Sequence, residues 1–562
     1  MRYLATWLVL LAACRPLSPT YSFDPQRTSL VTERDMVVSA HPLATAAGVQ
    51  VLAQGGNAVD AAVAVQLALA VVLPAAGNIG GGGFMVLRGP DGQVHTLDYR
   101  ETAPAAAHRD MYLDSLGEVV AAQSWRGHRA AGVPGSVAGM WAAHDSLGYL
   151  PWPDLVQPAI DLAARGFALT PAEADGLNEK REDLLRYSTR PHPYAGDRPW
   201  QPGDTLRLPA LAETLARIRD AGAAGFYTGP VADSLVAEMQ RGGGHISHAD
   251  LQAYRPVWRP PVVAHYRDLR IISMGPPSSG GIALAQLLAL VEPYPLADYG
   301  FQSVEAVHLM VEAERRVYAD RAAHLGDPDF YPVPVQGLLD SAYLAGRMAD
   351  FDPARATVSA ALAAGAPREH EETTHLSIVD AAGNAVAVTT TLNGGYGSCV
   401  VVGGAGFLLN NEMDDFSSKP GVPNAYGLVG AEANAIAPGK RMLSSMTPTI
   451  VERQGQLYMV VGTPGGSTII TSVFQTILAV HAFGFRMQGA VDAPRFHHQW
   501  LPDAIQCETA ALSPAVRSRL AAMGHSLTDR SPIGRVDAIL VRPDGRLEAG
   551  ADPRGDDTAG GH

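Results

Sequence analysis

Two threonines, Thr373 and Thr374, stand at the head of a β-like run, directly behind the largely acidic segment 369–372. A threonine hydroxyl is a poor nucleophile at neutral pH and needs a neighbouring base to accept its proton. A threonine at a chain terminus carries that base itself, because its α-amine has a pKa of about 8. Thr373 is therefore a candidate nucleophile for acyl transfer, provided that it begins a chain.

This chemistry requires cleavage of the Glu372–Thr373 bond, which we expect the Thr373 hydroxyl to perform by attacking the preceding carbonyl. Residues 352–372 show little periodicity and are predicted to form an exposed linker, so that the new terminus can move away from the site. A structural alternative is open: threonine is a good β-former, and both threonines suit the start of a strand without any chemistry.

The segment 385–393 is predicted to be a strand that returns after a turn at 380–384. Side chains in a strand alternate between faces with a period of two, so Thr389, Thr391 and Asn393 share one face. In a hairpin this face can lie beside Thr373 and supply a hydroxyl and an amide.

Layers of helices against two β-sheets are predicted to position these residues. Residues 41–73 are typical of two Ala-rich helices, with Asn57 as the N-cap of the second. The remaining predicted elements are a hairpin at 84–100, helices over most of 136–372 with a β-interruption at 262–281, short strands after 373, helices near 468–483 and 512–523, and a hairpin at 537–552. Burying them together predicts an α/β, α+β layered protein.

Composition indicates a large globular chain of 562 residues, 47% of them hydrophobic, with a net charge of −14. No Lys/Arg-rich run is present, which argues against a nucleic-acid partner. Cys399 and Cys507 are the only cysteines after Cys14, so neither a disulfide framework nor zinc-ligand spacing is present. His497 and His498 are adjacent rather than four apart, which favours a structural role. We expect neither a metal nor a cofactor.

The N-terminus contains a short apolar run, Leu4–Leu11, followed by Leu-Ala-Ala-Cys. The run cannot span about 30 Å of hydrocarbon and is typical of a secretory signal. Its end resembles the lipobox of bacterial lipoproteins, in which Cys14 would become the lipidated first residue. Residues 1–14 are thus predicted to be a lipoprotein-type signal peptide of an exported bacterial protein, periplasmic or anchored to the outer membrane. The alternative is an ordinary signal peptide that contains a cysteine.

Seven segments of the chain follow one family's order. They are GNIGGGGFMVL, LDYRETAP, GPPSSGG, TTHLSIVDAAGNAVAVTTTLN, GFLLNNEMDDFSSKPGVPNAYGLVG, KRMLSSMTPTIV and GTPGGS. Together they resemble the γ-glutamyltranspeptidases, members of the N-terminal-nucleophile hydrolases, from about Met36 to Asp557. The resemblance implies a four-layer αββα sandwich.

The resemblance also implies catalytic roles. Thr373 would be the nucleophile formed by autoprocessing, and Thr391 would bond to its hydroxyl and tune it. Gly465 and Gly466 would offer two backbone N–H groups as an oxyanion hole, because glycine allows unhindered approach.

Six further positions match residues that hold the substrate's α-amino and α-carboxylate groups. The first group is Asn393, Glu412 and Asp415, and the second is Arg100, Ser444 and Ser445. Carboxylates suit an ammonium, and a guanidinium fork suits a carboxylate. Relatives carry Gln or Glu at the position of Glu412. Taken singly, these residues also suit ion pairs, a turn and a helix cap.

Residues 419–434 match a lid loop that some family members have, with Tyr426 as the residue that covers the pocket. The glycine-rich segment 77–84 lacks the Gly-Lys-Ser/Thr of a phosphate loop, so we do not expect nucleotide binding. The Pro-Pro-Ser-Ser-Gly-Gly segment at 276–281 lacks a Gly-x-Ser-x-Gly elbow and is predicted to be a buried turn. Residues 531–541 receive no role.

The expected protein is a γ-glutamyltransferase and glutathione hydrolase that acts on glutathione or other γ-glutamyl compounds, with water, an amino acid or a peptide as acceptor. It would be cut from one precursor into a large chain, 15–372, and a small chain, 373–562, that form a heterodimer. Two alternatives are open: a related acylase that hydrolyses β-lactam side-chain amides, and an uncut lipoprotein that binds amino acids or peptides without turnover.

Overall fold

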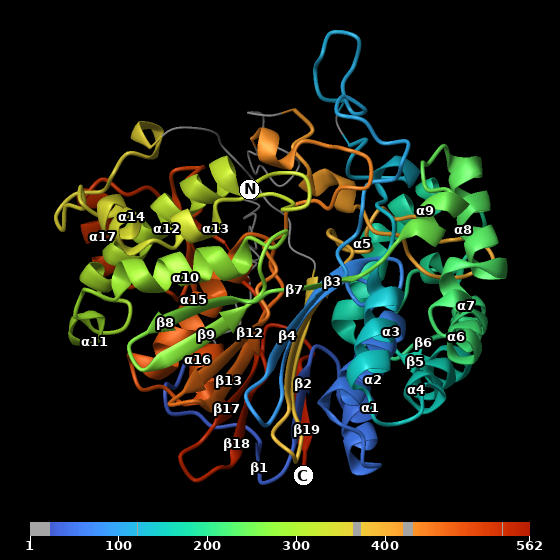
Figure 1. Cartoon of the computed structure of the whole chain (residues 1–562), viewed down its shortest axis with the longest axis horizontal. Helices are drawn as coiled ribbons and strands as arrows, with labels where there is room; N and C mark the ends of the chain where they lie inside the picture. The colour runs from blue at the N-terminus through green and yellow to red at the C-terminus, as the bar shows by residue number, and fades with distance from the viewer. Residues whose placement is uncertain (1–22, 121, 363–372, 420–430, 531) are drawn as a thin grey trace, which may run out of the picture.

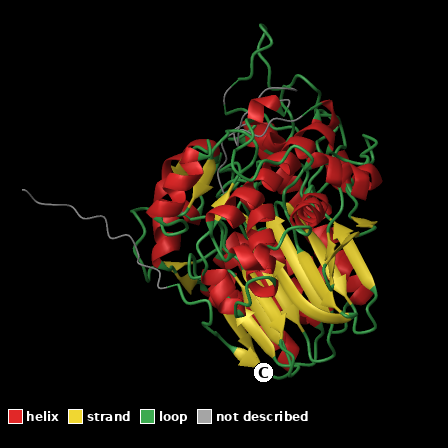
Figure 2. Ribbon diagram, turned by 90° about the vertical axis from the view of Figure 1, so that its left-hand side faces the viewer, coloured by secondary structure: helices red, strands yellow, loops and turns green. Residues whose placement is uncertain are grey.

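The computed structural model of the protein describes residues 23–120, 122–362, 373–419, 431–530 and 532–562. In this part of the chain two seven-stranded antiparallel sheets lie face to face (Figures 1 and 2). Sheet A has the order β1-β18-β17-β13-β12-β9-β8, and sheet B the order β19-β2-β10-β11-β3-β4-β7. Sheet A consists of β1 (Val31–Thr32), β8 (Val262–Tyr266), β9 (Leu269–Ser273), β12 (Thr449–Arg453), β13 (Gln456–Gly462), β17 (Asp537–Val541) and β18 (Leu547–Gly550). Sheet B consists of β2 (Met36–Ser39), β3 (Gly82–Arg88), β4 (Val94–Asp98), β7 (Val257–Arg259), β10 (Thr373–Val379), β11 (Ala385–Thr391) and β19 (Thr558–Gly561).

Helices cover the outer face of each sheet, which gives the predicted layer order of helix, sheet, sheet and helix (Figure 1). On the side of sheet B lie α1 (Pro42–Ala53), α2 (Ala58–Val72), α3 (Ser136–Leu147), α4 (Trp152–Arg165), α5 (Pro171–Tyr187), α6 (Pro209–Ala221), α7 (Ala224–Tyr227), α8 (Gly229–Gly242) and α9 (His248–Ala253). On the side of sheet A lie α10 (Gly280–Val291), α11 (Leu296–Tyr299), α12 (Val304–His324), α13 (Val335–Leu338), α14 (Ser341–Arg347), α15 (Thr468–His481), α16 (Met487–Asp492) and α17 (Pro514–Ala522). Smaller sheets are formed by β5 (Phe167–Ala168) with β6 (Thr205–Leu206), and by β14 (Phe496–His497), β15 (Ile505–Cys507) and β16 (Leu527–Asp529).

The α2 helix shows how sequence and packing agree. Asn57 caps it as predicted, because the Asn57 side chain accepts from the Asp60 N–H while the Asp60 carboxylate accepts from the Asn57 N–H. Every residue of α2 is buried, which fits an Ala- and Val-rich helix that packs against α1, α4 and the central strands of sheet B.

The side chains of strand β10 point alternately into two layers of the molecule. Leu376 and Ile378 face the helices over sheet B, whereas Val379 belongs to the apolar cluster between the two sheets. Thr373, His375 and Ser377 have the parity of Val379, so they point between the sheets. One end of the space between the sheets is therefore polar, and it contains the candidate nucleophile.

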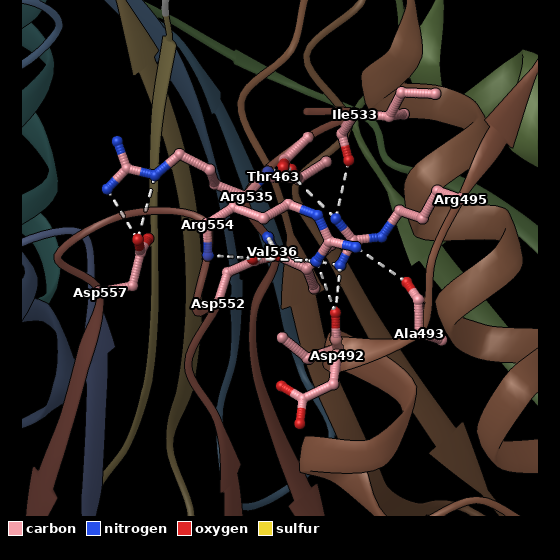
Figure 3. Close-up of polar contacts among 12 residues, drawn as sticks. Thr463, Asp492, Ala493, Arg495, Ile533, Arg535, Val536, Asp552, Arg554 and Asp557 are labelled. Atoms are coloured by element: carbon pink, nitrogen blue, oxygen red, sulfur yellow. Dashed lines mark hydrogen bonds and ion pairs between the residues drawn. The ribbon is translucent and has the colours of Figure 1, made fainter. Parts of the chain in front are cut away.

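The C-terminal residues are held by ion pairs (Figure 3). The Arg535 guanidinium lies 2.7 Å from the Asp557 carboxylate, just before β19, and the Arg495 guanidinium lies 2.9 Å from Asp552. The backbone N–H of Arg535 donates to Thr463 Oγ1 at 2.8 Å. Segment 531–541 received no role from the sequence, and its described residues, 532–541, connect the C-terminus to the loop that follows β13.

The segment before Thr373 is only partly the exposed linker that the sequence predicted. Residues 352–355 are exposed, but Ser359 is buried: its N–H donates to Asp503 at 2.8 Å, and its carbonyl accepts from the Trp500 indole at 3.0 Å. Periodicity could not reveal these contacts because their partners lie more than a hundred residues away. Residues 363–372 lie outside the described part of the chain.

Within the described residues, none of the helices is both long enough and apolar enough to cross a membrane. The apolar run Leu4–Leu11 and Cys14, on which the export prediction rests, lie outside these residues.

Candidate active site

Thr373 and Thr391 form a close pair between the two sheets. Thr373 begins β10, Thr391 ends β11, and the antiparallel register places them directly opposite each other. The Thr373 hydroxyl donates to Thr391 Oγ1 at 3.3 Å, and Thr391 Oγ1 also accepts from the backbone N–H of Asn393 at 2.7 Å. The period-two prediction is thus confirmed for Thr391, which supplies a hydroxyl neighbour to the candidate nucleophile.

Thr389 occupies the next step of the same face, but its partner is His375. The His375 ring hydrogen-bonds Thr389 Oγ1 at 2.9 Å and Ser377 Oγ at 3.1 Å. Burial lowers the pKa of His375 to about 3, so the ring is neutral at physiological pH. Thr389 therefore supports the strand pair beneath Thr373 and does not contact the nucleophile.

Arg100 stands at the centre of a buried acidic cluster. It follows β4, and its guanidinium lies 2.6 Å from Glu412 and 3.6 Å from Glu101, and it also donates to Asp415. Glu412 and Asp415 belong to the short 3-10 helix η4 (Glu412–Asp415), more than 300 residues away in the chain. The structure thus places a predicted carboxylate binder directly against two predicted ammonium binders.

The cluster has more carboxylates than cations. Burial alone would lower the pKa of Arg100, but the charges of Glu412, Asp415 and Glu101 raise it, so the guanidinium stays ionised. Burial raises the pKa of Glu412 well above its usual value, and Arg100 only partly offsets this effect. A site of this kind is short of positive charge, which suits a ligand that brings an ammonium group.

Glu101 should make folding stability depend on pH. Burial raises the pKa of this carboxyl from 4.5 to about 8, although the charge of Arg100 opposes the rise. Between these two values the native state keeps a proton that the unfolded state has lost. Stability therefore falls as pH rises through this window, by at most about 1.4 kcal/mol per pH unit for one proton.

We expect Glu101→Gln to flatten this dependence, because the amide cannot ionise. Urea unfolding at pH 5.5 and 7.5 measures it: the wild type should lose more free energy of unfolding across the interval than the variant. Glu432→Gln is the matched control, since Glu432 pairs with Arg109 at an exposed position. Equal losses in the wild type and in Glu101→Gln would show that Glu101 does not carry the effect.

Ser444 and Ser445 lie in the loop before β12, against the segment that was predicted to be a buried turn. The Ser279 hydroxyl donates to the Ser444 carbonyl at 2.7 Å, and the Ser278 hydroxyl donates to the Met446 carbonyl at 2.6 Å. The turn prediction is confirmed, because Ser278 and Ser279 bind backbone carbonyls. The two segments hold one another, which fixes Ser444 and Ser445 relative to sheet A.

The loop between β13 and α15 contains Gly465 and Gly466. Both have positive φ, +133° and +54°, and the first value is open almost only to glycine. A Cβ on Gly465 would lie 2.5 Å from Thr468 Oγ1, an atom that donates to the Gly465 carbonyl. The loop therefore depends on glycine for its conformation, and it places Gly466 in the same pocket as Thr373.

His497, the first residue of the His497–His498 pair, contacts residues that flank this loop. The His497 ring lies 2.7 Å from Gln499 Oε1 and 2.8 Å from Thr471 Oγ1, and Ser467, next to Gly466, donates to the same Gln499 oxygen. Burial lowers the pKa of His497 to about 3, so this ring is neutral. The contacts agree with the predicted structural role.

Among the described residues, one group has the geometry to hold a metal ion: His308, Glu312 and His525. Glu312, however, already accepts from Arg316 at 2.6 Å and from the Thr357 N–H at 3.0 Å, and the two imidazoles bond to each other at 2.8 Å. Two arginines border this group, which disfavours a cation. We interpret this group as a structural, hydrogen-bonded contact between α12 and its neighbouring segments.

One pocket brings most of the predicted site residues together. Its lining comprises Arg100, Arg321, Thr373, Thr391, Asn393, Glu412, Asp415, Ser444, Ser445, Met446, Gly466, Ser467 and Ile469. Gly465 is not part of this lining but directly precedes Gly466, which is, and Tyr426 lies outside the described residues. Arg321 was missed by sequence reasoning. The available signal was the charged Glu-Arg-Arg and Ala-Asp-Arg segments on a helix whose neighbours are apolar.

A family model described as gamma-glutamyltranspeptidase matches residues 44–562. The chain belongs to the gamma-glutamyltranspeptidase family. It is 45% identical to the glutathione hydrolase proenzyme of Escherichia coli K12, over 98% of this chain and 96% of that protein, and 50% identical to that of Pseudomonas aeruginosa, over 90% of each. A cephalosporin acylase from Bacillus halodurans has the same fold, with a TM-score of 0.83 and 26% identity over 98% of this chain and 99% of that one.

Membership of the gamma-glutamyltranspeptidase family confirms the resemblance that the seven segments suggested. The αββα expectation is confirmed as well, by the four layers and by the solved relative.

Proposed function

We propose that this protein is a γ-glutamyltransferase and glutathione hydrolase that uses Thr373 as its nucleophile. The observation that carries the proposal is that one pocket holds both the Thr373–Thr391 pair and the charged cluster of Arg100, Glu412 and Asp415. A γ-glutamyl donor has an ammonium and a carboxylate at one end and a scissile amide at the other. The pocket offers carboxylates and a guanidinium, whose charges are opposite to those of the donor's ammonium and carboxylate, together with a nucleophile for the amide.

The proposed first step makes the nucleophile. The Thr373 hydroxyl attacks the carbonyl carbon of Glu372 and the C–N bond breaks, so that an ester to Thr373 Oγ1 forms and the Thr373 α-amine is freed. Water then hydrolyses this ester to the Glu372 carboxylate and restores the Thr373 hydroxyl. Residues 15–372 and 373–562 then form the two chains of one heterodimer. Cleavage directly before Cys14 and lipidation of Cys14 would anchor the exported protein to the outer membrane, whereas an ordinary signal peptide would release it into the periplasm.

Catalysis then needs only groups of this chain. The Thr373 oxygen attacks the γ-carbonyl carbon, and its proton passes to the Thr373 α-amine. The N–H groups of Gly465 and Gly466 stabilise the oxyanion, and the leaving amine takes the proton as the C–N bond breaks. Water or an acceptor amine attacks the resulting ester, which releases glutamate or a new γ-glutamyl amide. In the proposed roles, Thr391 tunes the nucleophile and Asn393 adds an amide to the ammonium site.

Recognition of the donor follows from the charges. Glu412 and Asp415 are proposed to hold the ammonium, and Arg100 with Ser444 and Ser445 the carboxylate. Because Arg100 contacts both acids without substrate, the zwitterion would insert into an existing charge array. Such pre-organisation limits the reorganisation that binding requires. Tyr426 is proposed to cover the bound donor.

A pair of donors tests the function. A γ-glutamyl anilide and a glutaryl anilide differ only in the α-amino group, and we expect kcat/KM to be about a hundredfold higher for the former. Anilide release should be stimulated by a dipeptide acceptor. Equal or faster cleavage of the glutaryl anilide would favour the acylase alternative. Tight amino-acid binding without turnover, by a chain that stays whole, would favour the binding lipoprotein.

A further inference from the structure

Arg321 is a second arginine of the pocket, and it comes from a different layer of the molecule than Arg100. It lies near the end of α12, it is 4% exposed, and it lines the pocket that contains Thr373. Its Nε donates to Ser279 Oγ at 2.9 Å, and one Nη donates to Ser445 Oγ at 2.8 Å. One guanidinium thus connects the buried turn at 276–281 with a serine of the proposed carboxylate site.

The direction of these hydrogen bonds determines what Ser445 can do. A guanidinium only donates, so the Ser445 oxygen is an acceptor toward Arg321 and keeps its own O–H for another partner. Ser445 itself lines the pocket. Ser279 is fixed in turn, because its N–H and its hydroxyl both donate to the Ser444 carbonyl, at 2.8 and 2.7 Å. Arg321 therefore sets the position of the Ser445 hydroxyl through a buried hydrogen-bonded frame.

The charges of the pocket point the same way. Arg100 faces three carboxylates, so it alone does not make the site positive. Burial raises the pKa of Asp415, while the charges of Arg100 and Arg321 both oppose that rise. Arg321 therefore adds positive charge beside the serines. Without it, the carboxylate of a bound donor would lie near Arg100 and the three acids that surround Arg100.

We propose that Arg321 is a positioning residue that determines specificity for an α-carboxylate: it holds Ser445 as an acceptor, so that the serine donates to the donor's carboxylate, and it supplies the second positive charge of that subsite. The inference rests on the proposed function, since it assigns a further residue to the same pocket.

Two donors that differ at one group separate this role from general support of the fold. The first is a γ-glutamyl anilide, and the second is its α-carboxamide analogue, in which the carboxylate is a neutral amide. Arg321→Gln should raise KM for the first about tenfold or more, because a charge-assisted contact is lost, while kcat stays within about threefold. With the carboxamide donor, kcat/KM should change by less than about threefold.

Further variants place the effect on Ser445. Arg321→Lys, which keeps the charge but loses the fork, should fall between the wild type and Arg321→Gln. In a double-mutant cycle, Ser445→Ala combined with Arg321→Gln should cost far less than the product of the two single effects, because one contact acts through the other. Arg347→Gln is the matched control: Arg347 pairs with Asp320 at 3.0 Å, next to Arg321 in the chain, and it does not line the pocket.

The outcomes are distinguishable. Equal losses on both donors, or wild-type KM values in Arg321→Gln, would overturn the inference and leave the proposed function intact. A wild-type protein that does not cleave the γ-glutamyl anilide at all would instead overturn the proposed function. If Arg321→Gln does not fold, Ser279→Ala and Arg321→Lys decide, because each should raise KM only for the donor that carries the carboxylate.

Discussion

The Thr373→Ala variant is expected to remain a single polypeptide, 59.2 kDa for the full sequence, and to lose at least about 10⁴-fold in kcat. Alanine has no hydroxyl to attack the preceding carbonyl, so neither the cut nor the acyl-enzyme can form. The fold should survive, because the variant removes only a hydroxyl and a methyl group that face the pocket between the sheets. Denaturing electrophoresis and N-terminal sequencing of any small chain measure the cut, and turnover of a γ-glutamyl anilide measures kcat.

The neighbouring residue provides a matched control. Thr374 lies on the opposite face of β10, is fully buried, and its hydroxyl makes no hydrogen bond to the described residues. Thr374→Val keeps the shape and should be cut and active like the wild type. A Thr373→Ala chain that still splits between 372 and 373 would contradict self-cleavage, and one that splits and also turns over would remove Thr373 as the nucleophile.

Local patterns in the sequence were enough to predict the elements that carry Thr373. Alternation placed Thr391 on the face that carries Thr373, because a hairpin with a short turn leaves few possible registers. The Asn57 cap and the helix that follows were predictable for the same reason: each depends on residues within a few positions of one another.

Contacts between layers could not be predicted in this way. Arg100 and Asp415 are 315 positions apart, and nothing in the periodicity of either segment indicates that they touch. The family resemblance assigned these two residues to one site, but it did not predict that they form an ion pair with each other. Arg321 escaped both methods. The charged segments mark its helix as unusual, but only its contacts with Ser279 and Ser445 show that Arg321 belongs to the pocket.

The ion cluster also explains why a single substitution at Arg100 has two separate consequences. Removing the guanidinium takes away a proposed contact with the substrate, and it leaves Glu101 and Glu412 buried without their cation. Breaking a buried pair from one side costs more than the pair contributes. Loss of activity in such a variant therefore does not by itself identify a substrate contact, whereas comparing two donors in Arg321→Gln separates a lost contact from a general loss.

Gly465→Ala is expected to lower kcat by about 10² to 10³, the cost typical of removing one oxyanion donor. The Cβ would lie 2.5 Å from Thr468 Oγ1, and the φ of +133° is unfavourable for any residue with a side chain, so the loop must move. We expect this movement to displace the two N–H groups of the proposed oxyanion hole. The KM for a γ-glutamyl anilide should stay within about threefold, because the charged groups proposed to hold the donor come from other segments of the chain than this loop.

Gly455→Ala is the control that separates displacement of the two N–H groups from a simple loss of folding stability. Gly455 lies in the turn between β12 and β13, has a φ of +76°, and a Cβ there would meet nothing within 4 Å. It should cost about 1 kcal/mol of folding stability and leave kcat unchanged. Thermal unfolding and steady-state kinetics on both variants give the comparison. If Gly465→Ala loses only stability, as Gly455→Ala does, the oxyanion must be stabilised by other groups; a loss confined to kcat places the developing negative charge at this loop.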